Sequence, residues 1–260
     1  MVKYNCVRGG IVIPLCGDVS PRKAKCLQLT MLKYKGFEQI KTLGGNALKI
    51  NTLLFDLDGT LIDTNPLIIE SFLFTIEKHT GQIYTKEAVL PFIGPPLIES
   101  MEKIDPNQAE EMMATYIEHN MSNHEGFVHP YPTVVETIKK LHEKGYKLAI
   151  VTTKITENAR LGLEITGLTP YFDVVIGLTE VENAKPHPEP IFKALEALDE
   201  TVENALMIGD NYHDIEAGQN AGTKTAGVAW AIKGREMLEA LKPDYMLEEL
   251  ADLLNILEVD

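Results

Sequence analysis

The chain of 260 residues is 45% hydrophobic and 24% charged, a composition that excludes collagen-like, coiled-coil and intrinsically disordered proteins. Its net charge of -14 argues against nucleic acids and anionic membranes as partners, because binding to their phosphates relies on a basic surface. No stretch approaches the roughly 20 apolar residues of a membrane span, and the apolar run 11–16 is too short for a secretory signal. We therefore expect a cytoplasmic protein.

Residues 1–49 differ from the rest of the chain in charge and in pattern. They carry nine Lys or Arg residues against two acidic ones, and they contain all three cysteines, Cys6, Cys16 and Cys26. The cysteines lack metal-site spacing and are odd in number, so reduced thiols are expected. The segment shows no sustained strand or helix period. We predict an N-terminal extension outside the fold, which is either a flexible tail or a segment upstream of a native start near Leu48.

From residue 51 onward, short apolar runs alternate with amphipathic segments. This alternation is typical of a parallel sheet covered by helices. The five expected strands are 52–55, 147–151, 174–176, 205–208 and 223–228. The four expected helices between the later strands are 133–144, 157–166, 188–198 and 214–221. The sequence therefore predicts a doubly wound, mainly parallel α/β core.

The stretch from Asp63 to His129 interrupts this alternation, because it contains no β-rich run. Its apolar residues recur at helical spacing instead, at Ile68, Phe72, Ile76, Met112 and Tyr116. We predict a core of residues 50–63 and 130–260, with a small all-helical cap of residues 64–129 inserted after the first strand.

Three histidines recur at intervals of five at the end of this insertion, namely His119, His124 and His129. Residues five apart do not share one face of a helix, so the spacing does not favour a zinc site. We predict that the three are polar surface residues.

The first predicted strand ends in Asp56-Leu57-Asp58-Gly59-Thr60. Open α/β sheets bind ligands at the carboxyl ends of their strands, where these two acids are expected. Carboxylates at positions i and i+2 point to the same side of an extended chain, and Gly59 permits a sharp turn behind them. The alternative is an ordinary acidic turn.

Other polar side chains follow the later strands. Thr152 and Thr153 end the second strand and offer hydroxyls to an anion, although they also suit a strand or a helix cap. Lys185 lies on a proline-stiffened loop, where a lone lysine usually faces solvent. Asp210 and Asp214 follow the fourth strand, and helix capping is their alternative role.

In order and spacing, these four motifs resemble those of the haloacid dehalogenase superfamily over residues 50–260. The resemblance implies that Asp56 is the nucleophile and Asp58 the general acid and base of a phosphoryl transfer. It implies that Lys185 and the residues Gly59, Thr60, Thr152 and Thr153 bind the substrate phosphate. It also implies Mg²⁺ bound by Asp56, Asp210 and the main-chain carbonyl of Asp58, with Asp214 near the metal or capping a helix.

Further segments, among them Leu90 to Leu97 and Gly222 to Trp230, look closely like the inorganic pyrophosphatases of bacilli within that superfamily. The resemblance implies hydrolysis of pyrophosphate, including that released when serine-phosphorylated HPr is dephosphorylated. The loop Phe92 to Leu97 looks like the cap loop that faces the reaction centre in the superfamily, and a packed turn between helices is its alternative. Phosphoglycolate phosphatase is the alternative, and a sugar-phosphate mutase or a non-catalytic phosphate-binding regulator are weaker ones. The predicted cap contains three lysines and no arginine to meet a carboxylate.

Overall fold

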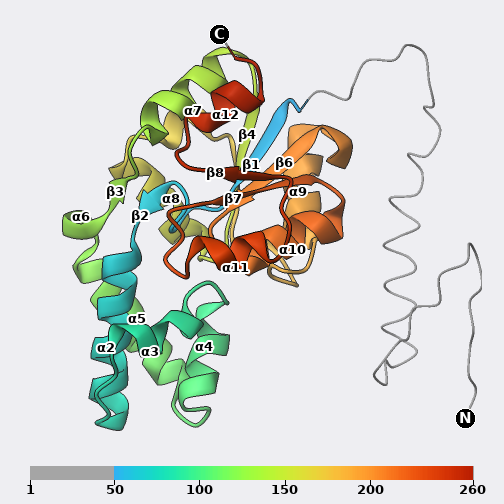
Figure 1. Cartoon of the computed structure of the whole chain (residues 1–260). Coiled ribbons are helices and arrows are strands. Elements are labelled where there is room, and N and C mark those ends of the chain that lie inside the picture. Colours follow the sequence, from blue (N-terminus) through green and yellow to red (C-terminus); the bar gives the residue numbers. More distant parts are fainter. Residues whose placement is uncertain (1–49, 260) are drawn as a thin grey trace, which may run out of the picture. The chain divides into compact units, whose positions relative to one another are not determined.

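The computed structural model describes residues 50–259, so the predictions for residues 1–49 lie outside the described residues. Its main sheet has six parallel strands in the order β5-β4-β1-β6-β7-β8 (Figure 1). The strands are β1 (Thr52–Phe55), β4 (Lys147–Val151), β5 (Val174–Ile176), β6 (Ala205–Gly209), β7 (Lys224–Val228) and β8 (Tyr245–Leu247). This arrangement confirms the predicted doubly wound α/β core and its five strands, and β8 is an addition at the edge of the sheet.

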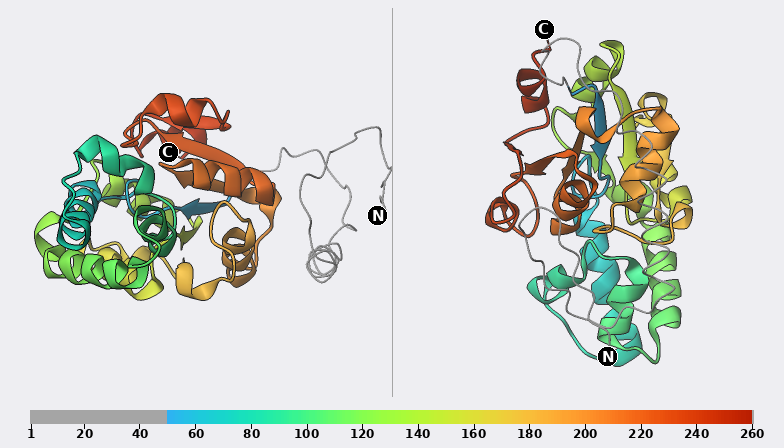
Figure 2. Two further views of the ribbon diagram at one scale, coloured as in Figure 1. Left: turned by 90° about the horizontal axis from the view of Figure 1, so that it is seen from below. Right: turned by 90° about the vertical axis from the view of Figure 1, so that its right-hand side faces the viewer.

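Helices cover both faces of the sheet (Figure 2). They are α7 (Val134–Glu143), α8 (Thr156–Ile165), α9 (Glu189–Leu198), α10 (Tyr212–Ala221), α11 (Arg235–Glu239) and α12 (Asp252–Ile256), with 3₁₀ turns η3 (Thr169–Tyr171), η4 (Leu178–Glu180) and η5 (Val202–Asn204). Side chains of α9 and α10 form one apolar cluster with the sheet, and those of α7, α8, α11 and α12 contribute to the other. The four helices predicted between the later strands are thus confirmed.

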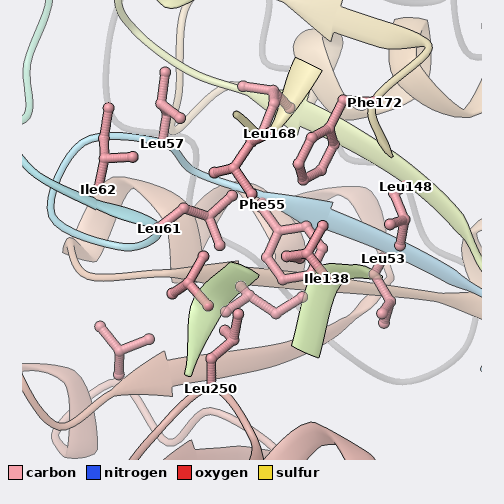
Figure 3. Packing of buried hydrophobic residues seen from close by; sticks show 14 of the residues in the cluster. Leu53, Phe55, Leu57, Leu61, Ile62, Ile138, Leu148, Leu168, Phe172 and Leu250 are labelled. Atoms are coloured by element: carbon pink, nitrogen blue, oxygen red, sulfur yellow. The ribbon is translucent and has the colours of Figure 1, made fainter. Parts of the chain in front are cut away.

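Strand β1 lies at the centre of the sheet and is buried on both sides. Its alternate side chains enter different clusters, Leu53 and Phe55 on one face and Leu54 on the other, as the pleat of a strand requires. Phe55 meets Phe172 edge to face, with ring centroids 6.0 Å apart (Figure 3). The core therefore fixes the position of the residues that follow β1.

The chain between β2 (Ile62–Asp63) and β3 (His129–Pro130) is mainly helical, as predicted, and we call residues 64–129, which end on the first residue of β3, the cap. Its helices are α2 (Asn65–Thr80), α3 (Lys86–Val89), η2 (Leu90–Phe92), α4 (Leu97–Ile104), α5 (Ala109–Ser122) and α6 (His124–Phe127). They enclose a separate apolar cluster that includes Phe72, Met112 and Tyr116. The strands β2 and β3 pair antiparallel, so the chain enters and leaves the cap side by side.

The prediction for the three histidines is wrong for His124. Its side chain is only 2% exposed, because α6 packs against α2, and burial lowers its pKa. Within the described residues, neither ring nitrogen of His124 has a hydrogen-bond partner. His129 is exposed, whereas His119 is half-buried and stacks on Phe74.

Between residues 50 and 259, no helix is both long enough and apolar enough to span a membrane.

Candidate active site

Three neighbouring strands bring the predicted site residues to one edge of the sheet. Strand β1 pairs with β4 on one side and with β6 on the other, and all three run parallel. Asp56, Thr152 and Asp210 each directly follow one of these strands, so their side chains meet at the carboxyl edge. All three are at most 7% exposed.

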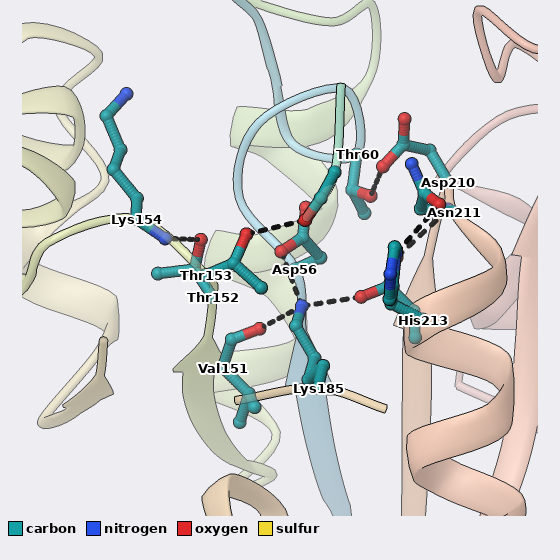
Figure 4. A network of polar contacts seen from close by, with 12 residues as sticks. Asp56, Thr60, Val151, Thr152, Thr153, Lys154, Lys185, Asp210, Asn211 and His213 are labelled. Carbon is teal, nitrogen blue, oxygen red and sulfur yellow. Dashed lines mark hydrogen bonds and ion pairs between the residues drawn. The ribbon is translucent and has the colours of Figure 1, made fainter. Parts of the chain in front are cut away.

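Lys185 is the centre of this group (Figure 4). Its ammonium donates to Oδ1 of Asp56 at 2.7 Å, to Oδ1 of Asp214 at 2.5 Å and to the carbonyl of Val151 at 2.7 Å. These three bonds use all three N–H donors of a lysine. Burial alone would lower the pKa of Lys185, but the carboxylates of Asp214 and Asp56 outweigh it and raise the pKa. Lys185 is therefore a buried, charged anchor and not the solvent-facing loop residue of the alternative interpretation.

Three buried carboxylates lie close together here, and two of them, Asp56 and Asp214, contact the Lys185 ammonium. Oxygens of Asp56, Asp210 and Asp214 all lie within 4.8 Å of one another. Burial raises the pKa of Asp56 to about 7, against the effect of Lys185 and with a further increase from Asp214. Burial, together with Asp56 and Asp214, likewise raises the pKa of Asp210. When all three carboxylates are ionised, the ammonium of Lys185 compensates one of their negative charges. Two negative charges remain, and a divalent cation can neutralise them.

Gly59 and Thr60 shape the turn behind Asp56. Gly59 has φ +82°, and a Cβ there would lie 2.4 Å from Oδ2 of Asp210, so a side chain would both strain the backbone and displace this carboxylate. The hydroxyl of Thr60 donates to Oδ1 of Asp210 at 3.4 Å. Both residues therefore act on the position of Asp210.

The sequence left two roles open for Asp214, a position near the metal and a helix cap. The structure combines them. As the third residue of α10, it accepts from the backbone N–H of Asn211 at 2.9 Å in a capping box, and its other oxygen accepts from Lys185. Asn211 completes the box by accepting from the backbone N–H of Asp214. The helix cap thus holds the Asp214 carboxylate against Lys185.

Asp58 lies outside the three-carboxylate group. Its Oδ1 accepts from the hydroxyl of Thr64 at 2.7 Å and from the ammonium of Lys154 at 2.9 Å. The side chains of Asp58 and Lys154 are each 17% exposed, so they remain accessible from the cavity. Lys154 was not predicted from the sequence, although it directly follows Thr152 and Thr153 after the end of β4.

The cap loop at Ile93 and Gly94 is held over the site by donors from the core. The hydroxyl of Thr153 donates to the carbonyl of Gly94 at 2.9 Å. Asn211 Nδ2 and Lys233 Nζ donate to the carbonyl of Ile93 at 3.3 Å and 2.6 Å. The hydroxyl of Thr153 is therefore bonded to the cap, whereas that of Thr152 accepts from the backbone N–H of Lys154.

The cap covers a cavity of about 160 Å³ above the carboxylates. Its floor includes Asp56, Asp58, Lys154 and Lys185. Its cap side is mainly apolar and includes Ile68, Phe72, Phe92, Ile93, Leu97, Ile98, Met113, Tyr116, Ile117 and Met121. The volume is below the roughly 300–1,000 Å³ of pockets for drug-sized ligands, so the site fits a small molecule.

Comparison with known proteins agrees with this geometry. A model of the family described as haloacid dehalogenase-like hydrolase matches residues 53–228. The chain is 57% identical over 212 residues to the Pyrophosphatase PpaX of Anoxybacillus flavithermus, a match that covers 82% of this chain and 99% of that protein. It is 55% identical over 210 residues to the Pyrophosphatase PpaX of Bacillus cereus, with 81% and 97% covered.

A solved structure, described as a predicted phosphoglycolate phosphatase from Haemophilus somnus, has a TM-score of 0.71 and 25% identity to the chain. The match covers 82% of this chain and 99% of that one. The family match, the two relatives and the shared fold together show that the chain belongs to the haloacid dehalogenase-like hydrolase family.

Proposed function

We propose that the protein is a Mg²⁺-dependent inorganic pyrophosphatase of the cytoplasm that uses Asp56 as its nucleophile. The observation that carries the proposal is the position of Asp56, whose buried carboxylate touches Lys185 at the floor of a small, cap-covered cavity. The relatives named Pyrophosphatase PpaX support pyrophosphate as the substrate, because the chain matches nearly their whole length.

Hydrolysis then proceeds in two displacements at Asp56. Its carboxylate attacks one phosphorus of pyrophosphate and forms an aspartyl-phosphate, while the other phosphate leaves. Water then attacks this aspartyl-phosphate and releases the second phosphate, which regenerates the carboxylate. Lys185 and the hydroxyl of Thr152 stabilise the negative charge that spreads over the transferred group.

Asp58 is the proposed general acid and base of this sequence. It protonates the oxygen of the departing phosphate and later accepts a proton from the attacking water. Its side chain suits the role because it lines the same cavity as Asp56 but lies outside the three-carboxylate group. Thr64 holds its Oδ1 in place.

The residues present fit a hard divalent cation. Asp56, Asp210 and Asp214 supply closely spaced oxygens with two uncompensated charges, and the main-chain carbonyl of Asp58 is a further proposed ligand. An all-oxygen set of this kind suits Mg²⁺, which keeps several water ligands. When bound, Mg²⁺ neutralises charge on the substrate phosphate and orients it for attack.

Asp210→Asn tests the metal assignment. We expect this variant to require about tenfold or more Mg²⁺ for half-maximal activity, since one charged ligand becomes neutral. A second readout is the melting temperature, which Mg²⁺ should raise less in the variant than in the wild type, because a ligand stabilises only the state that binds it. Identical Mg²⁺ titrations of both proteins would contradict the assignment.

Gly94→Ala tests the closed cap loop. Gly94 has φ +108°, and a Cβ there would lie 2.2 Å from Nδ2 of Asn211, so the variant cannot keep this contact. We expect kcat/KM for pyrophosphate to fall by about 100-fold, as when a displaced loop no longer positions the reactants. Gly126→Ala is the control, since apart from its own stretch of chain no atom of the described residues lies within 4 Å of the added Cβ. Wild-type kinetics of Gly94→Ala would mean that closure is not needed.

Phosphoglycolate is the alternative substrate, favoured by the name of the Haemophilus somnus relative. Its carboxylate would need a cation from the cap. However, none of the cap lysines Lys78, Lys86 and Lys103 is among the described residues that line the cavity. A phosphate-release panel with pyrophosphate, phosphoglycolate and an aryl phosphate decides between the two. Pyrophosphate should give the fastest release and a chelator should abolish it, whereas no turnover of any substrate would favour a non-catalytic phosphate-binding regulator.

A further inference from the structure

We propose that Lys154 binds the departing phosphate of pyrophosphate and thereby selects a substrate with a second charged group. This inference rests on the proposed function and concerns the half of the substrate that Asp56 does not attack. The position of Asp58, the proposed general acid, indicates where the departing phosphate lies.

The position of the departing phosphate follows from Asp58. A general acid must lie about 2.6–3.2 Å from the oxygen that it protonates, so this oxygen lies next to the Asp58 carboxylate. The ammonium of Lys154 is 2.9 Å from Oδ1 of Asp58, and Lys154 lines the same cavity. The ammonium is therefore within reach of the other oxygens of the departing phosphate.

Lys154 has N–H donors available for a phosphate oxygen, whereas those of Lys185 are all used by other groups. Lys185 uses its three N–H donors on Asp56, Asp214 and Val151, and it lies on the side of the transferred phosphoryl group. Figure 4 shows the ammonium of Lys154 outside that cluster. A lysine has three donors, so Lys154 can contact Asp58 and a phosphate oxygen at once.

The apolar surface of the cap makes a cation such as Lys154 necessary for binding the departing phosphate. A phosphate that enters the cavity loses part of its water and meets an apolar cap surface that includes Phe72, Met113 and Ile117. A buried charge without a partner is strongly unfavourable, and charge-assisted hydrogen bonds offset that cost. Lys233, the nearby cation of the core, is already bonded to the carbonyl of Ile93 and does not belong to the cavity lining of residues 50–259.

Asp58 keeps its other contacts when Lys154 is replaced. The hydroxyl of Thr64 still donates to Oδ1 of Asp58 at 2.7 Å, and the backbone turn at Asp58 and Ile62 does not involve Lys154. A loss that arose only from a misplaced Asp58 would therefore lower turnover and leave the binding of a non-hydrolysable analogue unchanged. A loss of phosphate binding would affect only a substrate whose leaving group carries a phosphate.

The test compares Lys154→Met with the wild type on pyrophosphate and on p-nitrophenyl phosphate at the same free Mg²⁺ concentration. We expect kcat/KM for pyrophosphate to fall by about 30-fold or more, mainly through a higher KM, and that for p-nitrophenyl phosphate by roughly threefold. Lys154→Arg should recover part of the pyrophosphate activity. Lys144→Met, at an exposed lysine on the core, is the matched control and should behave as wild type.

A binding measurement gives a second readout that does not depend on turnover. Methylenediphosphonate should inhibit Lys154→Met about 30-fold less strongly than the wild type, whereas inhibition by inorganic phosphate should change much less. Equal losses for both substrates, or no loss for either, would overturn the role of Lys154. A wild-type protein that does not hydrolyse pyrophosphate would instead overturn the proposed function, so the two failures are distinguishable.

Discussion

Asp56→Asn should lose at least about 10⁴-fold in kcat for pyrophosphate, a barrier increase of about 5.5 kcal/mol. The amide is nearly the same size as the carboxylate but cannot attack phosphorus, so no aspartyl-phosphate can form. The fold should remain intact. Burial raises the pKa of Asp56 to about 7, so at pH 8 its ionised form is a cost to the native state that the amide removes.

The measurement is steady-state phosphate release together with a thermal melt in chelator at pH 8. Asp173→Asn, at an exposed aspartate of the core, is the control and should keep wild-type activity. Activity of Asp56→Asn within about tenfold of the wild type, or about 1.4 kcal/mol, would refute the nucleophile assignment. A large fall in melting temperature would show instead that the variant had damaged the fold.

Lys185→Met should lose both activity and stability. Its ammonium is the hydrogen-bonded partner of the buried carboxylates of Asp56 and Asp214, so its removal leaves them without a cation. Removing one partner of a buried ion pair costs about 3–5 kcal/mol. For a fold of this size we expect the melting temperature in chelator to fall by roughly 10 °C, and kcat to fall by about 1,000-fold because the transferred phosphoryl group loses its cation.

A double variant separates charge imbalance from lost packing. Lys185→Met with Asp214→Asn removes one negative charge together with the positive one, and the amide oxygen can still accept from Asn211 in the helix cap. We expect the double variant to melt at a higher temperature than Lys185→Met alone. A double variant that is less stable than Lys185→Met would show that packing around the lysine, and not charge, accounts for the loss.

The sequence predicted the main features of the fold because each depends on local patterns. Strands β1 and β6 are continuous apolar runs that end abruptly in acids, and such runs are typical of buried parallel strands. Strand β8 has only three residues, Tyr245–Leu247, two of them half-buried, which is too short for a strand pattern to be recognised. Its position depends on pairing with β7, which is a long-range contact.

In the candidate site, too, features that depend on local sequence were predicted, whereas those that depend on long-range packing were not. The strand ends indicated Asp56, Thr152 and Asp210, because neighbouring parallel strands end at one edge. The burial of His124 depends on the packing of α6 against α2, which no local pattern specifies.

The contact between Lys154 and Asp58 joins residues 96 positions apart. A rule that takes every polar residue within three positions of a strand end would have included Lys154 as well as Asp58, but it would not have paired the two. The hydrogen bonds of Thr153 and Asn211 to the cap loop likewise required the folded chain.

The most direct test of the central claim is kcat/KM for pyrophosphate and for phosphoglycolate, measured on the wild-type protein at matched free Mg²⁺. The cavity is small, its cap side is apolar, and its accessible cation Lys154 lies beside Asp58, where a departing phosphate would be. We therefore predict a kcat/KM for pyrophosphate that is about tenfold or more above that for phosphoglycolate. A clear preference for phosphoglycolate would contradict the assignment.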